Sequence, residues 1–164
     1  MFVRFSRLPV LLLLALFAFS AQAETVSVGD ALPALEFEDQ NDQARDFPGD
    51  ARLIFFAGDK ASGEMSSEAL ASMSAEQMEA AGLVYLMDVS PMPGFVTRMF
   101  VLPGLRERPY PILLAREDGQ TDFMPIREKH VTVIRLDESR RIESIEFVEE
   151  AKALQDMLDP KSAS

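Results

Sequence analysis

A polar turn followed by a helix holds the side chains that could do chemistry in this chain. The turn covers residues 58–62 and, with the start of the helix, brings together Asp59, Lys60, Ser62 and Glu64. A helix N-terminus presents free backbone N–H groups and a partial positive charge, so with Lys60 it could hold a carboxylate or a small anion. The structural alternative is that Asp59 or Ser62 caps the helix while Lys60 is solvated.

The composition excludes thiol chemistry and an ordinary zinc site. The chain has no cysteine, so it can neither exchange disulfides nor reduce peroxides through a thiolate. A single histidine, His130, cannot supply the nitrogen and sulfur ligands that zinc requires. A serine nucleophile needs only a base within reach, so a Ser62–His130 pair is conceivable, but no G-x-S-x-G elbow surrounds Ser62.

Methionine offers one further metal chemistry. A soft thioether site for Cu(I) could be built around His130 from four methionines, which are Met87, Met92, Met99 and Met124. Methionines at helical and strand spacing usually fill the core instead. We therefore expect no metal site and no cofactor.

The first residues predict an export signal, 1–23. Arg4 and Arg7 give a positive start, an apolar run follows at 10–19, and Ala21-Gln22-Ala23 has the small-x-small pattern that signal peptidase requires. The apolar run is about half of the roughly twenty residues that span a bilayer, so we expect cleavage after Ala23 rather than a retained anchor. The expected location of the mature chain is the periplasm or the outside of the cell, without membrane insertion.

The mature chain is acidic and fits one domain. The sequence holds 16 Lys and Arg against 27 Asp and Glu, a net charge of −11, and loss of the leader arginines makes the balance more acidic still. Such a surface repels phosphate, which argues against nucleic acid and anionic lipid as partners. We expect a domain at 24–160 and a flexible tail at 161–164.

Hydrophobic patterns predict the order of elements within that domain. The expected strands lie at 35–38, 44–47, 53–57, 83–87, 110–114, 131–136 and 142–147. The expected helices lie at 63–81 with a left-handed cap at Gly82, at 95–102 with a stop at Pro103-Gly104, and from Glu149 to Pro160. The strands at 53–57 and 83–87 with the helix between them form a βαβ unit, which implies a parallel pair.

This order resembles the thioredoxin-like superfamily, nearer its peroxiredoxin and thiol-disulfide oxidoreductase branches. The resemblance covers nearly all of the mature chain through short motifs, which are Val28–Pro33, Ile54–Ala57, Tyr110–Leu114 and Val131–Asp137. Residues 88–95 and Tyr110-Pro111, with the export signal, also resemble the periplasmic YtfJ-like proteins. The resemblance implies an α/β fold, a thioredoxin-like three-layer α/β/α sandwich with a mixed sheet and an N-terminal β-hairpin extension.

Two signatures of that superfamily are missing. Its redox motif follows the strand matched by Leu53–Ala57, where residues 58–64 contain no cysteine. Its cis-proline precedes the strand matched by Val131–Leu136, where this chain has Lys129 and His130. The resemblance therefore implies a vacated cleft, with His130 near the polar side chains of residues 59–64.

A segment bracketed by prolines, residues 91–103, is the candidate partner surface. Exposed Phe95, Met99 and Phe100 would make an adaptable apolar patch, whereas the alternative is that they pack against the sheet. We predict a redox-inactive, exported binding or accessory protein with an exported protein as its partner. The rival prediction is an enzyme, or a small-ligand or metal-binding protein, that uses Lys60, Glu64 and His130.

Overall fold

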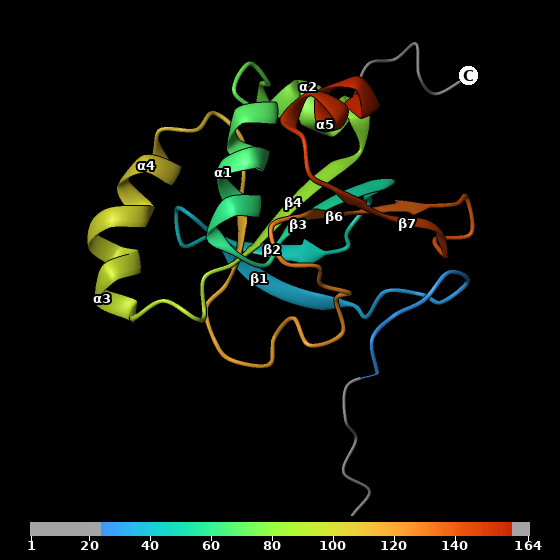
Figure 1. Ribbon diagram of the computed structural model, residues 1–164, viewed down its shortest axis with the longest axis horizontal. Helices are drawn as coiled ribbons and strands as arrows, with labels where there is room; N and C mark the ends of the chain where they lie inside the picture. Colours follow the sequence, from blue (N-terminus) through green and yellow to red (C-terminus); the bar gives the residue numbers. More distant parts are fainter. Residues whose placement is uncertain (1–23, 159–164) are drawn as a thin grey trace, which may run out of the picture.

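One mixed seven-stranded sheet, in the order β2-β1-β5-β4-β3-β6-β7, forms the centre of the molecule (Figure 1). The strands are β1 (Leu35–Asp39), β2 (Ala44–Phe47), β3 (Leu53–Ala57), β4 (Leu83–Asp88), β5 (Leu113–Ala115), β6 (Val131–Leu136) and β7 (Ile142–Val148). β3, β4 and β5 run parallel, β6 and β7 are antiparallel additions, and the β1–β2 hairpin joins β5 at the opposite edge. This computed structural model describes residues 24–158, so the predicted export signal and tail lie outside the described residues.

The helices of the described residues pack on one face of the sheet (Figure 1). They are α1 (Lys60–Ala69), α2 (Ala75–Ala81), α3 (Gly94–Val96), the π-helical turn η1 (Thr97–Val101), α4 (Leu102–Arg106) and α5 (Ala151–Leu158). Leu70, Leu102 and Leu154 bring them into one buried cluster with the sheet. Within residues 24–158, no helix is both long enough and apolar enough to cross a bilayer.

The opposite face of the sheet has its own core. Its side chains alternate with those of the first face, so Ile54 and Phe56 of β3 point here while Phe55 points toward the helices. The described segments that cover this face are loops, which contribute residues such as Leu32 and Phe123. The mixed α/β fold and the N-terminal hairpin are as predicted, and the outer layer on this second face consists of loops.

The helix predicted at 63–81 is wrong as a single element, because the chain forms two helices. α1 ends at Ala69, and its C-cap, Leu70, is completely buried. Ser74 then starts α2 with a capping box, in which the Ser74 and Gln77 side chains each accept the other's backbone N–H. The left-handed cap at Gly82 is confirmed by its φ of +63°.

The helix predicted to stop at Pro103-Gly104 instead runs on to Arg106. The π-helical turn shifts the hydrogen-bond register ahead of the proline, and the N–H of Leu102 bonds to the carbonyl of Thr97. Pro103 then lies in the first turn of α4, where its missing N–H is tolerated. The predicted stop was therefore wrong, because the π-helical turn η1 lets Pro103 lie in the first turn of α4 rather than end the helix.

The side chain of Gln40 explains why the strand predicted at 110–114 shortens to Leu113–Ala115. Gln40 is 1% exposed, and its Nε2 donates to the carbonyl of Tyr110 while its Oε1 accepts the N–H of Ile112, both at 2.8 Å. These two backbone groups bond to an amide side chain rather than to a neighbouring strand. Among the described peptide bonds, the cis bond is Phe47–Pro48, so the bond before Pro111 is trans.

Two arginines make further hydrogen bonds to the β1–β2 turn, next to Gln40. Arg106, at the end of α4, donates through Nε to the carbonyl of Gln40 at 2.8 Å and through Nη2 to Asp42 Oδ2 at 3.0 Å. Arg116 donates to Asp42 Oδ1 at 2.9 Å. The hydrogen bond from Arg116, helped by the charge of Arg106, holds the pKa of Asp42 below its usual value. The hairpin therefore fixes the far end of the α3–η1–α4 segment.

Replacing Gln40 by alanine should lower the free energy of unfolding by about 2 kcal/mol or more. The carbonyl of Tyr110 and the N–H of Ile112 would both lose their partner in a buried place. Urea denaturation measures the loss. The control is Asn41→Ala at the neighbouring exposed position, expected to change stability by about 0.5 kcal/mol at most. Equal stability of the two variants would contradict the role given to Gln40.

Candidate functional site

Asp59 organises the polar segment in front of α1. Its Oδ1 accepts the N–H of Ser62 at 2.8 Å, and Ser62 Oγ accepts the N–H of Asp59 at 3.1 Å. This reciprocal pair is a capping box, which satisfies two N–H groups at the start of the helix. The structural alternative, in which these two residues cap the helix, is confirmed.

The second oxygen of Asp59 reaches the other side of the site. Oδ2 accepts the backbone N–H of Lys129 at 2.6 Å, in the loop that leads into β6. Lys129 has a φ of +62°, and with His130 it occupies the place where the resemblance puts a cis-proline, a residue without an N–H. One carboxylate therefore joins the first turn of α1 to the loop before β6.

The environment of Asp59 favours its charged form. Burial acts to raise the pKa of Asp59, but hydrogen bonds from the backbone N–H groups of Ser62 and Lys129 outweigh it. They hold the pKa below its usual value of 3.8. The Asp59 carboxylate, which links α1 to the loop before β6, is therefore negatively charged near neutral pH.

Ser62 and His130 do not form a nucleophile pair in the described structure. Ser62 is completely buried, and its Oγ lies 2.9 Å from the carbonyl of Asp59. His130 Nδ1 lies 2.8 Å from the carbonyl of Glu128, and Nε2 lies 3.5 Å from Glu149 Oε2. Both side chains already have partners elsewhere, so the geometry gives Ser62 a structural role.

A groove of about 730 Å³ runs between α1 and the segment that follows β4. Its α1 wall is one helix face with residues three or four apart, which are Lys60, Gly63, Glu64, Ser67 and Glu68, and Ala71 in the turn after α1 extends this wall. The facing wall and floor are mainly apolar and include Met87, Met92 and Val101. Asp59 lies at one end, so three predicted site residues (Asp59, Lys60 and Glu64) line the groove, whereas Ser62 and His130 do not.

Lys60 and Glu64 lie at the rim of this groove and are mostly in solvent. Lys60 Nζ is 3.5 Å from Glu64 Oε1, and the two side chains are 88% and 70% exposed. Exposed pairs of this spacing contribute only a few tenths of a kcal/mol. Both groups are therefore available to a partner at little energetic cost.

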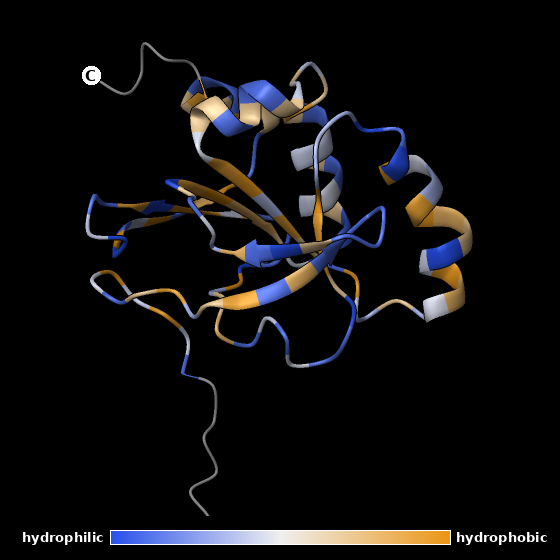
Figure 2. Ribbon diagram, turned by 180° about the vertical axis from the view of Figure 1, so that it is seen from behind, coloured by the Kyte–Doolittle hydropathy of each residue, from blue (hydrophilic) through white to orange (hydrophobic). Residues whose placement is uncertain are grey.

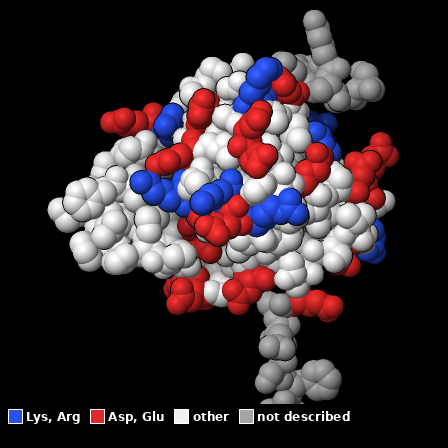
Figure 3. Space-filling view, in the orientation of Figure 1, with Lys and Arg blue, Asp and Glu red and all other residues white. Residues whose placement is uncertain are grey.

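Phe95, Met99 and Phe100 are all exposed, at 66%, 66% and 72%. They project from α3 and η1, while Thr97 and Leu102 of the same segment are buried. Figure 2 shows the apolar residues of this segment, and Figure 3 shows that the surface over it, at the left of the view, is largely uncharged. We call Phe95, Met99 and Phe100 the apolar patch. The predicted role as a partner surface requires that these side chains be exposed, and they are.

Solved structures with a similar backbone identify the architecture. A protein assigned as a protein disulfide isomerase from Bacteroides thetaiotaomicron matches with a TM-score of 0.56 and 10% identity over 80% of this chain and 88% of its own. A peroxiredoxin-like protein from Aquifex aeolicus matches with a TM-score of 0.52 and 12% identity over 83% and 90%. This chain has the thioredoxin-like fold. At such identity the likeness concerns the fold alone.

A third similar structure is the thioredoxin domain of a thiol-disulfide oxidoreductase from Bacteroides vulgatus, with a TM-score of 0.50 and 10% identity over 82% of this chain and all of that domain. The sequence itself matches no family model and no curated protein. The resemblance to YtfJ-like proteins therefore stays a prediction. The three neighbours are named for thiol chemistry, whereas this thioredoxin-like chain has no cysteine.

The thioredoxin-like chain does not gather its methionines into one thioether site. Met87 and Met92 line the groove, but Met124 is buried in the core of the opposite sheet face and Met99 is exposed. Within residues 24–158, no three histidine or carboxylate side chains are arranged to hold a metal ion.

Sequence reasoning missed the Lys129 backbone and the small residues of the groove. A Cβ on Gly63 would lie 3.3 Å from Met87 Cε, so glycine lets α1 pack closely over Met87 at the floor of the groove. The signal was present, because Gly63 and Ala71 are small residues that share one face of the helix predicted at 63–81. The bond from Lys129 left no sequence signal, because it depends on a left-handed backbone turn at a lysine.

Asp59→Asn should destabilise the thioredoxin-like domain by about 1–2 kcal/mol near pH 6 and by less below about pH 3. Because the folded-state pKa of Asp59 lies below 3.8, its contribution is present above that value and is lost as the pH falls through the folded-state pKa. Urea denaturation of both proteins at the two pH values measures the difference. Asp118→Asn, an exposed carboxylate outside the site, is the control. A difference that does not change with pH would show that the Asp59 charge contributes nothing.

Proposed function

We propose that this chain is an exported binding or accessory protein without redox activity, which holds a protein partner on the apolar patch and in the adjoining groove. The observation that carries the proposal is the exposure of Phe95, Met99 and Phe100 on one helical segment. Soluble proteins rarely expose large apolar side chains together unless they bind something there. Phenylalanine and methionine are also enriched at protein interfaces.

The helical segment that carries the patch is fixed to the rest of the molecule by packing and hydrogen bonds, which favours a binding surface over simple exposure. Leu102 and Leu105 anchor the end of the segment in the core, and Arg106 ties it to Gln40 and Asp42 of the hairpin. A surface held in one orientation loses little conformational entropy when a partner binds.

The area of the patch favours a partner that also enters the groove. At their exposed fractions, the three side chains present about 400 Å². A standard interface buries about 800 Å² on each partner, so the patch alone is too small for a stable contact between two copies. Met92 and Val101 line the groove from the same segment, so a partner chain lying there covers both surfaces.

The rival proposal, an enzyme or small-ligand or metal-binding protein that uses Lys60, Glu64 and His130, has less support. Asp59 and Ser62 satisfy each other, and His130 is drawn toward Glu149 rather than toward the groove. No arrangement of these groups favours a particular reaction.

Photo-crosslinking in the native cell tests the patch. A photoreactive phenylalanine analogue placed at Phe100 should give a discrete adduct with a second protein, and a further Phe95→Ser or Met99→Ser change should reduce that adduct at least about tenfold. Val28→Ser is the control, because Val28 is 63% exposed but lies outside the patch. No adduct, or an adduct reduced equally by Val28→Ser, would contradict the proposal.

Export is tested separately by expressing residues 1–164 in a Gram-negative bacterium. We expect the protein in the periplasmic fraction with a mass that begins at Glu24, because Ala21 and Ala23 supply the small residues that signal peptidase reads. Ala23→Leu should leave a longer precursor attached to membranes. A cytoplasmic protein that still begins at Met1 would refute export.

A further inference from the structure

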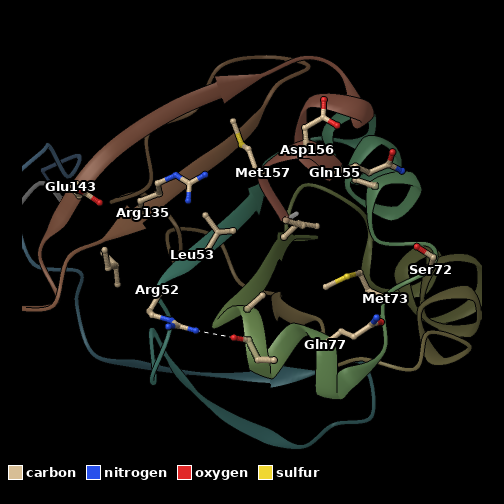
Figure 4. A pocket seen from close by; sticks show the side chains of 15 residues that line it. Arg52, Leu53, Ser72, Met73, Gln77, Arg135, Glu143, Gln155, Asp156 and Met157 are labelled. Carbon is tan, nitrogen blue, oxygen red and sulfur yellow. Dashed lines mark hydrogen bonds between the residues drawn. The ribbon is translucent and has the colours of Figure 1, made fainter. Parts of the chain in front are cut away.

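A second cavity, of about 920 Å³, lies at the other end of the helix-covered face (Figure 4). Leu53, the first residue of β3, lines this cavity, whereas Asp59, just beyond the last residue of β3, lines the groove. At the end of α1 the linings come close together, because Ala69 and Ser72 line the cavity while Glu68 and Ala71 line the groove, but no residue lines both. The remaining walls come from the ends of α1, α2 and α5 and from β6 and β7.

Arg135 is the unusual group in this cavity. It is half-buried on β6, on the same face as Val131 and Val133, and Figure 4 shows its guanidinium pointing toward Leu53 and Met157. Within residues 24–158, its side chain makes no hydrogen bond and no ion pair. By contrast, Arg52 at the cavity wall donates to the carbonyl of Ala80 at 2.8 Å.

Within residues 24–158 Arg135 lines a cavity without a carboxylate partner, although carboxylates are abundant in this chain. Aspartate and glutamate outnumber lysine and arginine by 27 to 16, and other arginines pair with carboxylates, among them Arg45 with Asp39 and Arg140 with Asp50. Withdrawing a guanidinium from water without giving it an acceptor costs free energy. A carboxylate that arrived with a ligand would satisfy two of its N–H groups at once.

The carboxylates already at the cavity do not take this role. Asp156 forms an ion pair with Lys152 at 2.9 Å. Glu143 is exposed on β7, and its side chain does not pair with Arg135. The acceptor position of Arg135 is therefore open to a ligand.

The rest of the lining is apolar or neutral. Leu53, Met73 and Met157 offer aliphatic and thioether surface beside Arg135, and Gln77 and Gln155 add neutral amides. Methionine side chains adapt to flexible apolar ligands. The volume is at the upper end of the range of about 300–1,000 Å³ for small-molecule sites.

We propose that this cavity binds a small carboxylate with an apolar tail, such as a medium-chain fatty acid, with the carboxylate on Arg135 and the tail over Leu53, Met73 and Met157. The cavity shares no lining residue with the groove or with the apolar patch. Ligand binding in it can therefore be tested separately from the proposed binding of a protein partner. It gives the chain a second binding activity for a different class of ligand.

Titration calorimetry with decanoate, below the concentration at which it forms micelles, tests the site on the full mature chain. We expect binding that Arg135→Gln weakens about tenfold or more, because a charge-assisted bond is lost. Decanol, which has the same tail without the charge, should bind weakly to both proteins. Arg98→Gln, at an exposed arginine on η1, is the matched control and should bind decanoate as the wild type does.

Three outcomes would overturn the proposal. They are no binding of decanoate, equal binding of decanoate and decanol, and equal binding by the wild type and Arg135→Gln. A third variant, Ala71→Trp, places a large side chain at a residue that lines the groove and not the cavity. Decanoate binding that survives Arg135→Gln and disappears in Ala71→Trp would place the ligand in the groove and also refute the Arg135 site.

Discussion

The carboxylate of Asp59 is the constraint on which the geometry of the site depends. Its two oxygens accept N–H groups from Ser62, in the first turn of α1, and from Lys129, in the loop before β6. One charged group thus sets where α1 begins and how it lies against the sheet. The α1 wall of the groove follows from that placement, because its residues repeat along a single helix face.

The facing wall is held by a different set of contacts. Leu102 and Leu105 bury one side of the α3–η1–α4 segment, and Arg106 binds the hairpin turn through Gln40 and Asp42. With the inner side fixed in this way, Phe95, Met99 and Phe100 are turned to solvent. The thioredoxin-like scaffold therefore holds both walls of the groove in place in a chain that has no cysteine.

Sequence patterns predicted the elements whose signals are local. β3 and β6 have the predicted bounds because β3 is a continuous apolar run and β6 is rich in β-branched residues, and Gly82 ends its helix as a left-handed cap. The break after Leu70 and the length of the segment to Arg106 depend on tertiary packing and on a π-helical turn, which helix propensity does not register. The same holds for the site: Asp59 was a recognisable cap, but its bond to Lys129 joins residues seventy positions apart in the sequence.

The bond between Asp59 and Lys129 also bears on how such a chain could evolve. A proline at position 129 would have no N–H, so a proline there and this bond exclude each other. Introducing that proline alone would leave Asp59 Oδ2 without its partner in the loop before β6. The choice of residue at position 129 is therefore constrained by the residue at position 59, on a different element of the fold.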